Sequence, residues 1–445
     1  MSSVTQGGFP PPERSAAAPG VLSGQRLRDL VLDRTKDPEL AEAVTVVSQV
    51  LPFKVSSYVL DELIDWTDPA GDPIYRMTLP HRDMLGPGDF AAVADVLRAG
   101  DCAQLRKVVD DVRDRLNPHP GDQLTRNLPG LDGPGGTGIQ HKYRDTVLVF
   151  PRQGQTCHSY CGYCFRWAQF VGRPDLRFAL GDPGEMTAYL DRHPEVTDVL
   201  ITGGDPLVMR TELLARYLEP LLAPDYAHVR TIRIGTKALS FWPYRFLDAP
   251  DGDHLLRLFE RVVRSGRHLA LMLHLSHPRE LATKPARQAV ERLLATGAVL
   301  RSQAPLIRHV NDDAATWATL WQDEVSLSIV PYYLFVERDT GAREYYQVPL
   351  ARAVDIHHAA VRRVSGLGRT ARGPVMSTSL GKVLVSGVAD LGAERVFVLQ
   401  LLRARDENLV GRPFFARFDP AATWWDQLVP RSESDGEFFR GLPPI

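Results

Sequence analysis

Short apolar runs alternate with amphipathic stretches through the middle of the 445-residue chain. The runs are rich in Val, Ile and Leu, as expected for strands buried on both faces, and they occupy residues 146–150, 196–202, 229–235, 268–274, 298–304 and 326–333. Between them, stretches such as 210–222 and 285–297 carry apolar residues at helical spacing. This alternation predicts parallel strands joined by right-handed crossovers. Six units predict an α/β fold built on a partial (β/α)6 TIM-type barrel, not a full barrel of eight units.

The rest of the chain divides around this core. Residues 1–24 are rich in Pro, Gly, Ser and Ala and predict a flexible leader, and residues 25–140 form a mostly helical N-terminal segment that ends in the Gly/Pro-rich passage 127–138. The core then covers 141–345. A C-terminal segment, 346–445, begins with a predicted helix at 350–364, continues with two β-like runs, and is expected to supply oligomer contacts.

Composition and charge exclude several classes of protein. The chain is 44% hydrophobic and 24% charged, with a net charge of −2, so nothing indicates a nucleic-acid partner. The leader has no long apolar run, which argues against a signal peptide or a membrane span. The chain has 4 cysteines, too few and too clustered for a disulfide framework. We therefore expect a protein of the reducing cytoplasm.

Three of the cysteines, Cys157, Cys161 and Cys164, lie close together directly after the first predicted strand of the core. In barrels of this kind the chemistry sits at the carboxyl ends of the strands. Three thiolates can hold a [4Fe–4S] cluster and leave one iron without a protein ligand, which is what a reactive centre needs. Two alternatives remain: a zinc site completed by His158, or thiols without a metal. Closed zinc sites usually draw their ligands from two separated segments, which disfavours the first.

The loop CxxxCxxC resembles that of the radical S-adenosylmethionine (SAM) superfamily. More narrowly, "CHSYCGYCFR", "LITGGDPL", "IRIGTKA", "HLSHP" and "LIRHVND" together resemble the lysine 2,3-aminomutase family, and so does the segment 51–80. The resemblance covers about residues 45 to 390, with the motifs in the same order as in the family. The combination is much more specific than any one motif.

The resemblance implies a cofactor at the cluster. The open iron would bind the amino and carboxylate groups of SAM, whose cleavage gives a 5′-deoxyadenosyl radical that removes hydrogen from an unactivated carbon. Gln303 matches a family residue that contacts SAM. The segment that receives the SAM amino group is matched by Thr202, Gly203, Gly204 and Asp205.

The resemblance also implies pyridoxal 5′-phosphate (PLP), held on a lysine. Lys382 stands at the family's distance from Ser365–Gly366, although "STSLG" (377–381) replaces the usual run of glycines. Lys142 and Tyr143 match residues near the PLP phosphate, and one basic residue of that pattern is replaced by Thr146. Arg166 matches the arginine that binds the substrate carboxylate. The implied reaction moves the α-amino group of an L-α-amino acid to Cβ.

Two departures from the family pattern change the expectation. No cysteine follows Cys164, and Asp313 stands where a zinc-binding cysteine would fall, so no zinc is expected. The two aspartates that hold the side-chain ammonium of lysine fall on Arg338 and Val375. An ammonium facing an arginine would be costly, which favours a substrate with an acidic, neutral or short side chain. A one-residue shift would bring Glu337 or Asp339 into the site instead.

Two other function classes stay open: a radical SAM enzyme of this fold that acts without PLP on an amino acid or peptide, and a non-catalytic Fe–S or zinc protein. For the aminomutase, the expected partners are a small amino acid substrate, an electron donor such as flavodoxin or ferredoxin, and a second copy of the chain in a homodimer, the commonest closed assembly.

Overall fold

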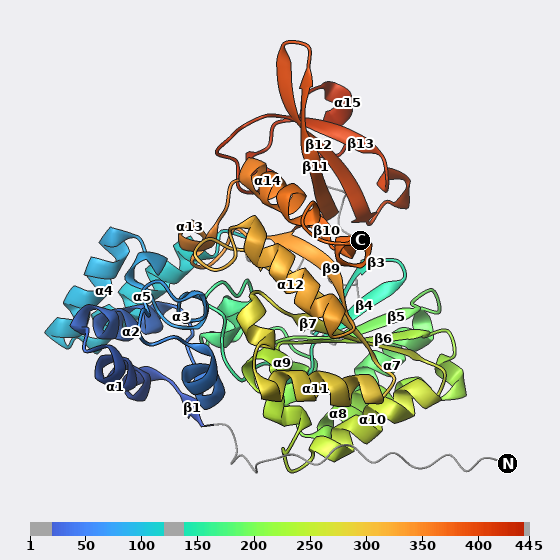
Figure 1. The fold of residues 1–445 in the computed structure, drawn as a ribbon, viewed down its shortest axis with the longest axis horizontal. Helices are drawn as coiled ribbons and strands as arrows, with labels where there is room; N and C mark the ends of the chain where they lie inside the picture. The colour runs from blue at the N-terminus through green and yellow to red at the C-terminus, as the bar shows by residue number, and fades with distance from the viewer. Residues whose placement is uncertain (1–19, 120–137, 440–445) are drawn as a thin grey trace.

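A single large sheet runs through the centre of the computed structural model, which describes residues 20–119 and 138–439 (Figure 1). The sheet has 11 strands in the order β13-β12-β11-β10-β9-β8-β7-β6-β5-β4-β3, so almost every strand lies beside its neighbour in sequence. The Gly/Pro-rich passage predicted as a loop, and most of the predicted leader, lie outside the described residues.

Six consecutive parallel strands form the middle of the sheet, and each coincides with one of the six predicted apolar runs: β4 (Thr146–Val149), β5 (Asp198–Ile201), β6 (Thr231–Thr236), β7 (His268–His274), β8 (Val299–Leu306) and β9 (Ile329–Val336). Because all six run the same way, their carboxyl ends meet at one edge of the sheet. The sequence prediction of strand identity and direction is therefore confirmed.

Five further strands extend the sheet: β3 (Ile139–Tyr143), β10 (Arg372–Ser377), β11 (Gly381–Leu391), β12 (Glu394–Ala404) and β13 (Pro413–Arg417). β3 pairs antiparallel with β4, and β10 pairs parallel with β9. The pairs from β10 to β13 are antiparallel. The C-terminal strands thus continue the central sheet and do not form a separate one.

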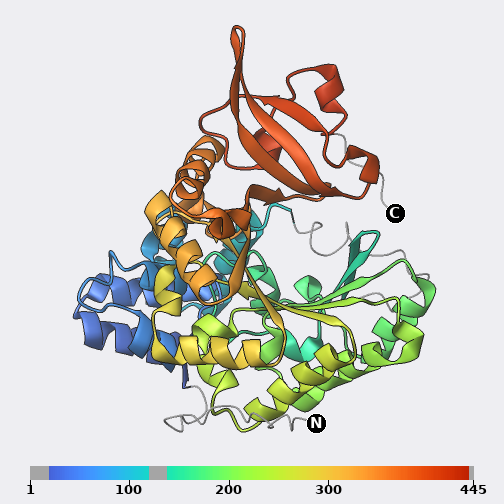
Figure 2. The same ribbon diagram turned by 45° about the vertical axis from the view of Figure 1, so that its right-hand side comes forward.

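Helices connect the parallel strands: α7 (Pro183–Arg192), α8 (Thr211–Leu218), α9 (Ala238–Phe241), α10 (Gly252–Arg264), α11 (Lys284–Ala295) and α12 (Ala314–Ser326). Polar capping residues define where several of these helices begin. Asp182, Thr283 and Asp313 each accept hydrogen bonds from backbone N–H groups of the first turn. Helices α8, α10 and α11 lie together on one side of the sheet in both ribbon views (Figures 1 and 2).

The remaining helices lie before and after the core: α1 (Gly24–Thr35), α2 (Pro38–Val50), α3 (Pro73–Thr78), α4 (Pro87–Ala99), α5 (Cys102–Leu116), α13 (Arg343–Tyr346), α14 (Leu350–Val361) and α15 (Glu433–Gly436). Two short strands, β1 (Val21–Leu22) and β2 (Val55–Ser56), pair with each other. Helix α14 confirms the helix predicted at 350–364.

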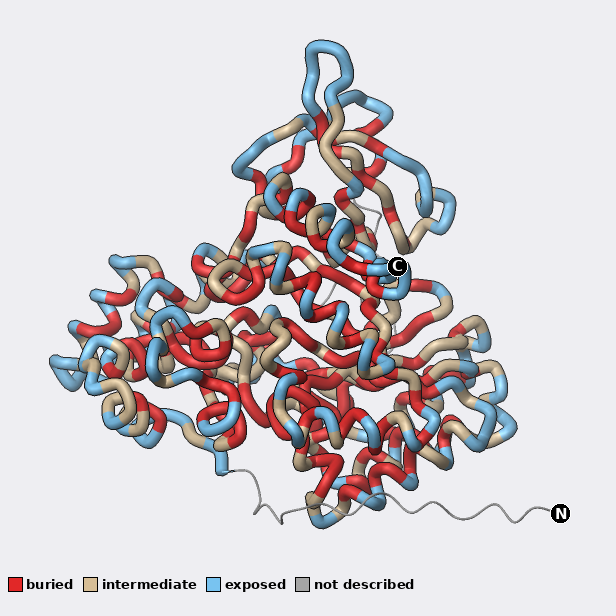
Figure 3. The backbone as a smooth tube through the Cα atoms, viewed as in Figure 1, coloured by how far each residue is buried: buried red, intermediate tan, exposed pale blue. Residues whose placement is uncertain are grey.

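Buried residues gather along the central strands and the inner faces of their helices, while the outer end of the β11–β12 hairpin is exposed (Figure 3). A second apolar cluster joins the N-terminal helices to the loop that carries the cysteines, through Tyr163 and Trp167. The N-terminal segment therefore packs directly on the predicted site. Among the described residues, no helix combines the length and apolar character needed to cross a bilayer.

Candidate active site

One cavity of about 390 Å³ opens at the carboxyl ends of the parallel strands, a size typical of small-molecule sites. Every site residue predicted from the sequence lines it: Lys142, Tyr143, Cys157, Cys161, Cys164, Arg166, Thr202, Gly203, Gly204, Asp205, Gln303, Arg338 and Lys382. These residues come from β3, from the ends of β4, β5, β8 and β9, and from β11. The fold thus brings together positions separated by more than half of the chain.

The N-terminal segment braces the cysteine loop. Tyr160 donates its backbone N–H to the carbonyl of Lys54 (2.9 Å), and Gly162 donates to the carbonyl of Met77 (2.8 Å). The side chain of Lys54 donates to Thr156 Oγ1 at 2.6 Å. These contacts give the segment 51–80, whose sequence resembles the family, a physical role in shaping the loop.

A zinc ion and a [4Fe–4S] cluster require different spacings of the three thiols. Bonds of about 2.3 Å to a single tetrahedral zinc would place sulfur ligands about 3.8 Å apart. In a [4Fe–4S] cluster each cysteine binds a different iron, so wider spacing is required. His158, the fourth ligand of the zinc alternative, does not line the cavity.

The electrostatic surroundings of the three cysteines, which form one end of the cavity, also fit a cationic metal centre. Burial, together with the neighbouring carboxyl and thiol groups, raises the pKa of Cys157 well above its usual value. Burial raises the pKa of Cys161 to about 11 and that of Cys164 to about 12. Three thiolates therefore need a bound cation to coexist here, and iron coordination supplies one.

Gly203 and Gly204 let two loops approach closely. A Cβ on Gly204 would collide with the backbone of Thr156, and Gly203, at φ +149°, would collide with the side chain of Gln155. These glycines are thus required for packing against the cysteine loop, whatever they contribute to a ligand.

Asp205 is almost fully buried, and its carboxylate accepts hydrogen bonds from the backbone N–H of Leu207 (2.9 Å) and Lys237 (2.9 Å) and from the Thr236 hydroxyl (2.8 Å). Burial raises its pKa to about 6. The side chain therefore ties the end of β5 to the end of β6. Thr202, Gly203 and Gly204 line the cavity beside it.

At the other end of the cavity, Lys382 lies over the aromatic rings of Tyr333 (4.0 Å to the ring centroid) and Phe335 (5.1 Å). Burial, followed by repulsion from Arg233, Arg403 and Arg372, lowers the pKa of Lys382 to about 7. A lysine amine that is about half neutral near pH 7 is a nucleophile suited to bond a carbonyl group.

Cationic and hydroxyl groups surround this lysine. Lys142 donates to the carbonyl of Thr378, and Ser377, Thr378 and Ser379 all line the cavity. Arg403 lies opposite Lys382 on β12, lies over the ring of Tyr143 at 4.6 Å, and bonds Asp145. The set fits a phosphate group through charge and donors.

Sequence reasoning missed Arg403 and Arg233, which also line the cavity. Arg233 lies within the motif "IRIGTKA" but was given no role, and Arg403 is an ordinary strand arginine outside every motif. The signal that could have found Arg403 is the substitution at Thr146. Arg403 Nη2 lies 3.5 Å from Thr146 Oγ1 and so restores a positive charge where the family pattern loses one.

Two arginines lie near the ring of Phe165: the guanidinium of Arg338 is 5.2 Å and that of Arg166 is 5.4 Å from its centroid. Arg166 is 6% exposed, and burial lowers its pKa to about 9. Glu337 also lines the cavity, and burial raises its pKa well above the usual value. Arg338 is a cavity residue as predicted, while Asp339 and Val375 do not line the cavity.

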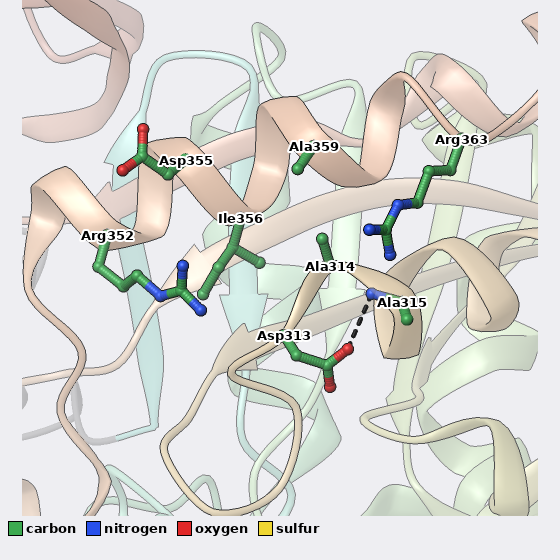
Figure 4. Close-up of a pocket in the computed structure, with 8 residues that line it drawn as sticks. All are labelled: Asp313, Ala314, Ala315, Arg352, Asp355, Ile356, Ala359 and Arg363. Carbon is green, nitrogen blue, oxygen red and sulfur yellow. Dashed lines mark hydrogen bonds between the residues drawn. The ribbon is translucent and has the colours of Figure 1, made fainter.

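Asp313, at the position of a family zinc ligand, serves as a helix cap. Its carboxylate accepts a hydrogen bond from the backbone N–H of Ala315 (2.8 Å; Figure 4). It accepts a second from the backbone N–H of Thr316 (2.9 Å), also at the start of α12. Arg352 of α14 and Arg363, which follows that helix, border the same surface pocket.

Comparisons with known proteins identify relatives of this chain. No family model matches the chain. It is 34% identical over 384 residues to a protein of Aquifex aeolicus that carries the provisional name L-lysine 2,3-aminomutase, covering 86% of this chain and 89% of the relative. It is 28% identical to L-lysine 2,3-aminomutase of Fusobacterium nucleatum (69% and 68% covered) and 25% identical to glutamate 2,3-aminomutase of Clostridioides difficile (61% and 62%).

Among solved structures, a radical SAM methyltransferase from Sphaerobacter thermophilus aligns with a TM-score of 0.38 and 17% identity over 61% of this chain and 84% of that chain, too distant to add to the assignment. The sequence relatives and the cavity define a radical SAM isomerase with a [4Fe–4S] cluster and SAM as its cofactors. The chain belongs to the lysine 2,3-aminomutase family.

Proposed function

We propose that the protein is a PLP-dependent amino acid 2,3-aminomutase whose preferred substrate carries an acidic side chain, ahead of neutral ones and with lysine behind both. The observation that carries the proposal is the pair of arginines, Arg166 and Arg338, near the same phenyl ring in a cavity that also contains Lys382. Two carboxylates on one substrate would neutralise both guanidinium groups.

The roles follow from the geometry. Cys157, Cys161 and Cys164 would hold the cluster, with the backbone at 202–204 and Gln303 beside SAM. Lys382 would hold PLP, with Lys142, Arg403 and the hydroxyls of 377–379 at its phosphate. When bound, these groups supply a hydrogen-abstracting radical and a conjugated system that carries the migrating nitrogen.

The chain's own residues then orient the substrate. Arg166 is buried and close to Cys164, so it would place the substrate α-carboxylate near the cluster end of the cavity. Arg338 follows β9 and would pair with a side-chain carboxylate. The aromatic walls formed by Phe165, Tyr333 and Phe335 would keep water from the reacting atoms.

Glu337 does not reverse this preference. Its carboxyl is 7% exposed, and burial raises its pKa well above the ordinary range, which favours its neutral form. This reduces the negative charge that Glu337 offers to a substrate ammonium, while Arg338 repels that ammonium. One relative is named glutamate 2,3-aminomutase, so at least one similar protein is named for an acidic amino acid.

The experiment is anaerobic incubation of the reconstituted protein with SAM, PLP and separate amino acids, with β-amino acid products identified by mass spectrometry. Glutamate or aspartate should react fastest. Arg166→Ala should weaken every substrate, whereas Arg338→Ala should weaken chiefly acidic ones. Faster turnover of lysine than of any acidic or neutral amino acid would overturn the substrate proposal and assign Glu337 as the residue facing the side chain. Equal activity without PLP would favour the PLP-independent alternative.

Three expectations about the barrel, the electron donor and the oligomer belong to the same proposal. We infer that β4 to β9 and their helices close into a partial (β/α)6 barrel, because six consecutive parallel strands follow sequence order. A flavodoxin or ferredoxin would reduce the cluster. A homodimer, with contacts from the C-terminal segment, is the simplest assembly.

A further inference from the structure

Outside the cavity, three side chains from distant segments meet at one point. His119 follows α5, Asp339 follows β9, and Asp426 lies in the C-terminal segment. The distance from His119 Nε2 to Asp339 Oδ2 is 3.0 Å, and that to Asp426 Oδ2 is 3.5 Å. All three ligand atoms lie within 4.8 Å of one another.

Asp339 gives this cluster its significance. The residue is 9% exposed, and among the described residues its Oδ2 atom has no hydrogen-bond partner. The 3.0 Å contact with His119 is therefore close but lacks the alignment of a hydrogen bond. A buried carboxylate oxygen that lies beside an imidazole nitrogen and a second carboxylate, without a hydrogen bond to either, is normally costly.

The separations of His119 Nε2 from the two carboxylate oxygens, 3.0 and 3.5 Å, are close to those of ligands around one ion. Two ligand atoms at about 2.1 Å from a metal, with an angle of about 90–109° between the bonds, lie about 3.0–3.4 Å apart. An ion pair would account for His119 with one aspartate, but it leaves the second carboxylate repelling the first. A divalent cation at the centre would satisfy all three groups.

We propose that His119, Asp339 and Asp426 bind a divalent first-row transition-metal ion such as Mn²⁺ or Zn²⁺. One imidazole and two carboxylates suit these ions, whereas Mg²⁺ and Ca²⁺ prefer oxygen ligands alone. The site is separate from the three cysteines. It also differs from the cysteine zinc site whose absence the sequence predicts, because none of its ligands is a thiol.

The ion would support the substrate end of the cavity. Asp339 directly follows Glu337 and Arg338, which line that cavity, and the ring of Trp424, two residues before Asp426, lies 5.8 Å from the Arg338 guanidinium. A metal here would fasten three segments around Arg338: the end of the N-terminal helices, the end of β9, and the C-terminal segment.

The test uses full-length protein with its cluster in place and Mn²⁺ alone as the probe, because Mn²⁺ does not favour thiol ligands. Electron paramagnetic resonance should show one bound Mn²⁺ per chain, and the nitrogen coupling of a coordinated imidazole should be present in the wild type and absent in His119→Gln.

Asp426→Asn should lower Mn²⁺ affinity at least tenfold. The matched control is Asp390→Asn, which removes the same charge from a side chain that is 81% exposed on β11 and should leave affinity unchanged. Equal thermal midpoints of these variants in metal-free buffer would show that each is folded. Equal Mn²⁺ affinity in wild type and Asp426→Asn, or bound Mn²⁺ without nitrogen coupling, would overturn the proposal.

Discussion

The two ends of the active-site cavity use the same physical effect in opposite directions. At the cysteine end, burial raises the pKa of Cys161 to about 11 and so disfavours the anion. At the lysine end, burial lowers the pKa of Lys382 to about 7 and so disfavours the cation. In each case the low-dielectric interior penalises the charged form.

The consequences for function differ. A thiol must lose its proton to bind iron, so the cysteine end requires a metal centre to become stable. A lysine must lose its proton to attack a carbonyl, so the lysine end is prepared before any cofactor arrives. The cysteine end is therefore expected to depend on cofactor loading for its order, and the lysine end on its protein surroundings.

The largest expected effect comes from removing one thiol. Cys161→Ala should lose most of the iron and all SAM cleavage, because two cysteines cannot hold a [4Fe–4S] cluster with one open iron. Iron analysis and chromatographic detection of 5′-deoxyadenosine would measure both. Cys102→Ala is the matched control, since Cys102 is exposed and outside the loop. Full SAM cleavage by Cys161→Ala would contradict the assignment.

A methyl group at Gly204 should disturb the cysteine end without touching a thiol. The added Cβ would press on the Thr156 backbone, so Gly204→Ala should lower the free energy of unfolding by about 1–3 kcal/mol and reduce cluster loading. Chemical denaturation and iron content would check this. Gly88→Ala, which meets no atom within 4 Å, should lose neither stability nor iron. If Gly204→Ala and Gly88→Ala had the same stability and iron content, the close approach of Gly204 to the Thr156 backbone would have no importance.

The lysine end can be weakened through its phosphate contacts. Arg403→Gln should reduce PLP affinity about tenfold or more, because it removes one charge-assisted hydrogen bond to the phosphate. Spectrophotometric titration with PLP measures this without turnover, and Arg403→Lys should recover part of the loss. Arg417→Gln, an exposed arginine on β13, is the control. Unchanged PLP affinity in Arg403→Gln would show that Arg403 does not bind the phosphate.

The smallest effect is a shift in titration. In PLP-free protein, reductive methylation of Lys382 should rise with a midpoint near pH 7, and in the unfolded chain it should rise with a midpoint near the ordinary lysine value of 10.5. Between about pH 7 and the ordinary lysine value of 10.5, the unfolded chain binds more protons at this site than the folded chain. This group therefore makes unfolding less favourable as pH rises through that window. Equal midpoints for Lys382 in the folded and unfolded chain would contradict the contrast between the ends.

The cysteine end was largely predictable from sequence, because Cys157, Cys161 and Cys164 lie on one loop and their spacing is local. All six parallel strands were predictable for a similar reason, since buried parallel strands are near-continuous apolar runs. β3 and β10 were not predicted: "IQHKY" is half polar, and "RGPVMS" contains Gly and Pro, which usually mark turns.

The lysine end was only partly predictable, because sheet pairing assembles it. Arg403 reaches Lys382 through the register of β11 with β12, and sequence periodicity does not specify a partner across strands. Alignment alone likewise left open which of Glu337, Arg338 and Asp339 faces the cavity. The structure places the first two there and directs Asp339 to His119.

The most direct test of the central claim, that one cavity carries an iron–sulfur end and a PLP end, is borohydride reduction of the PLP-loaded protein followed by peptide mapping. The account predicts a pyridoxyl label on the peptide that contains Lys382, lost in Lys382→Ala while iron content and SAM cleavage persist. A label on Lys237 or Lys142, or no label on any lysine, would contradict it.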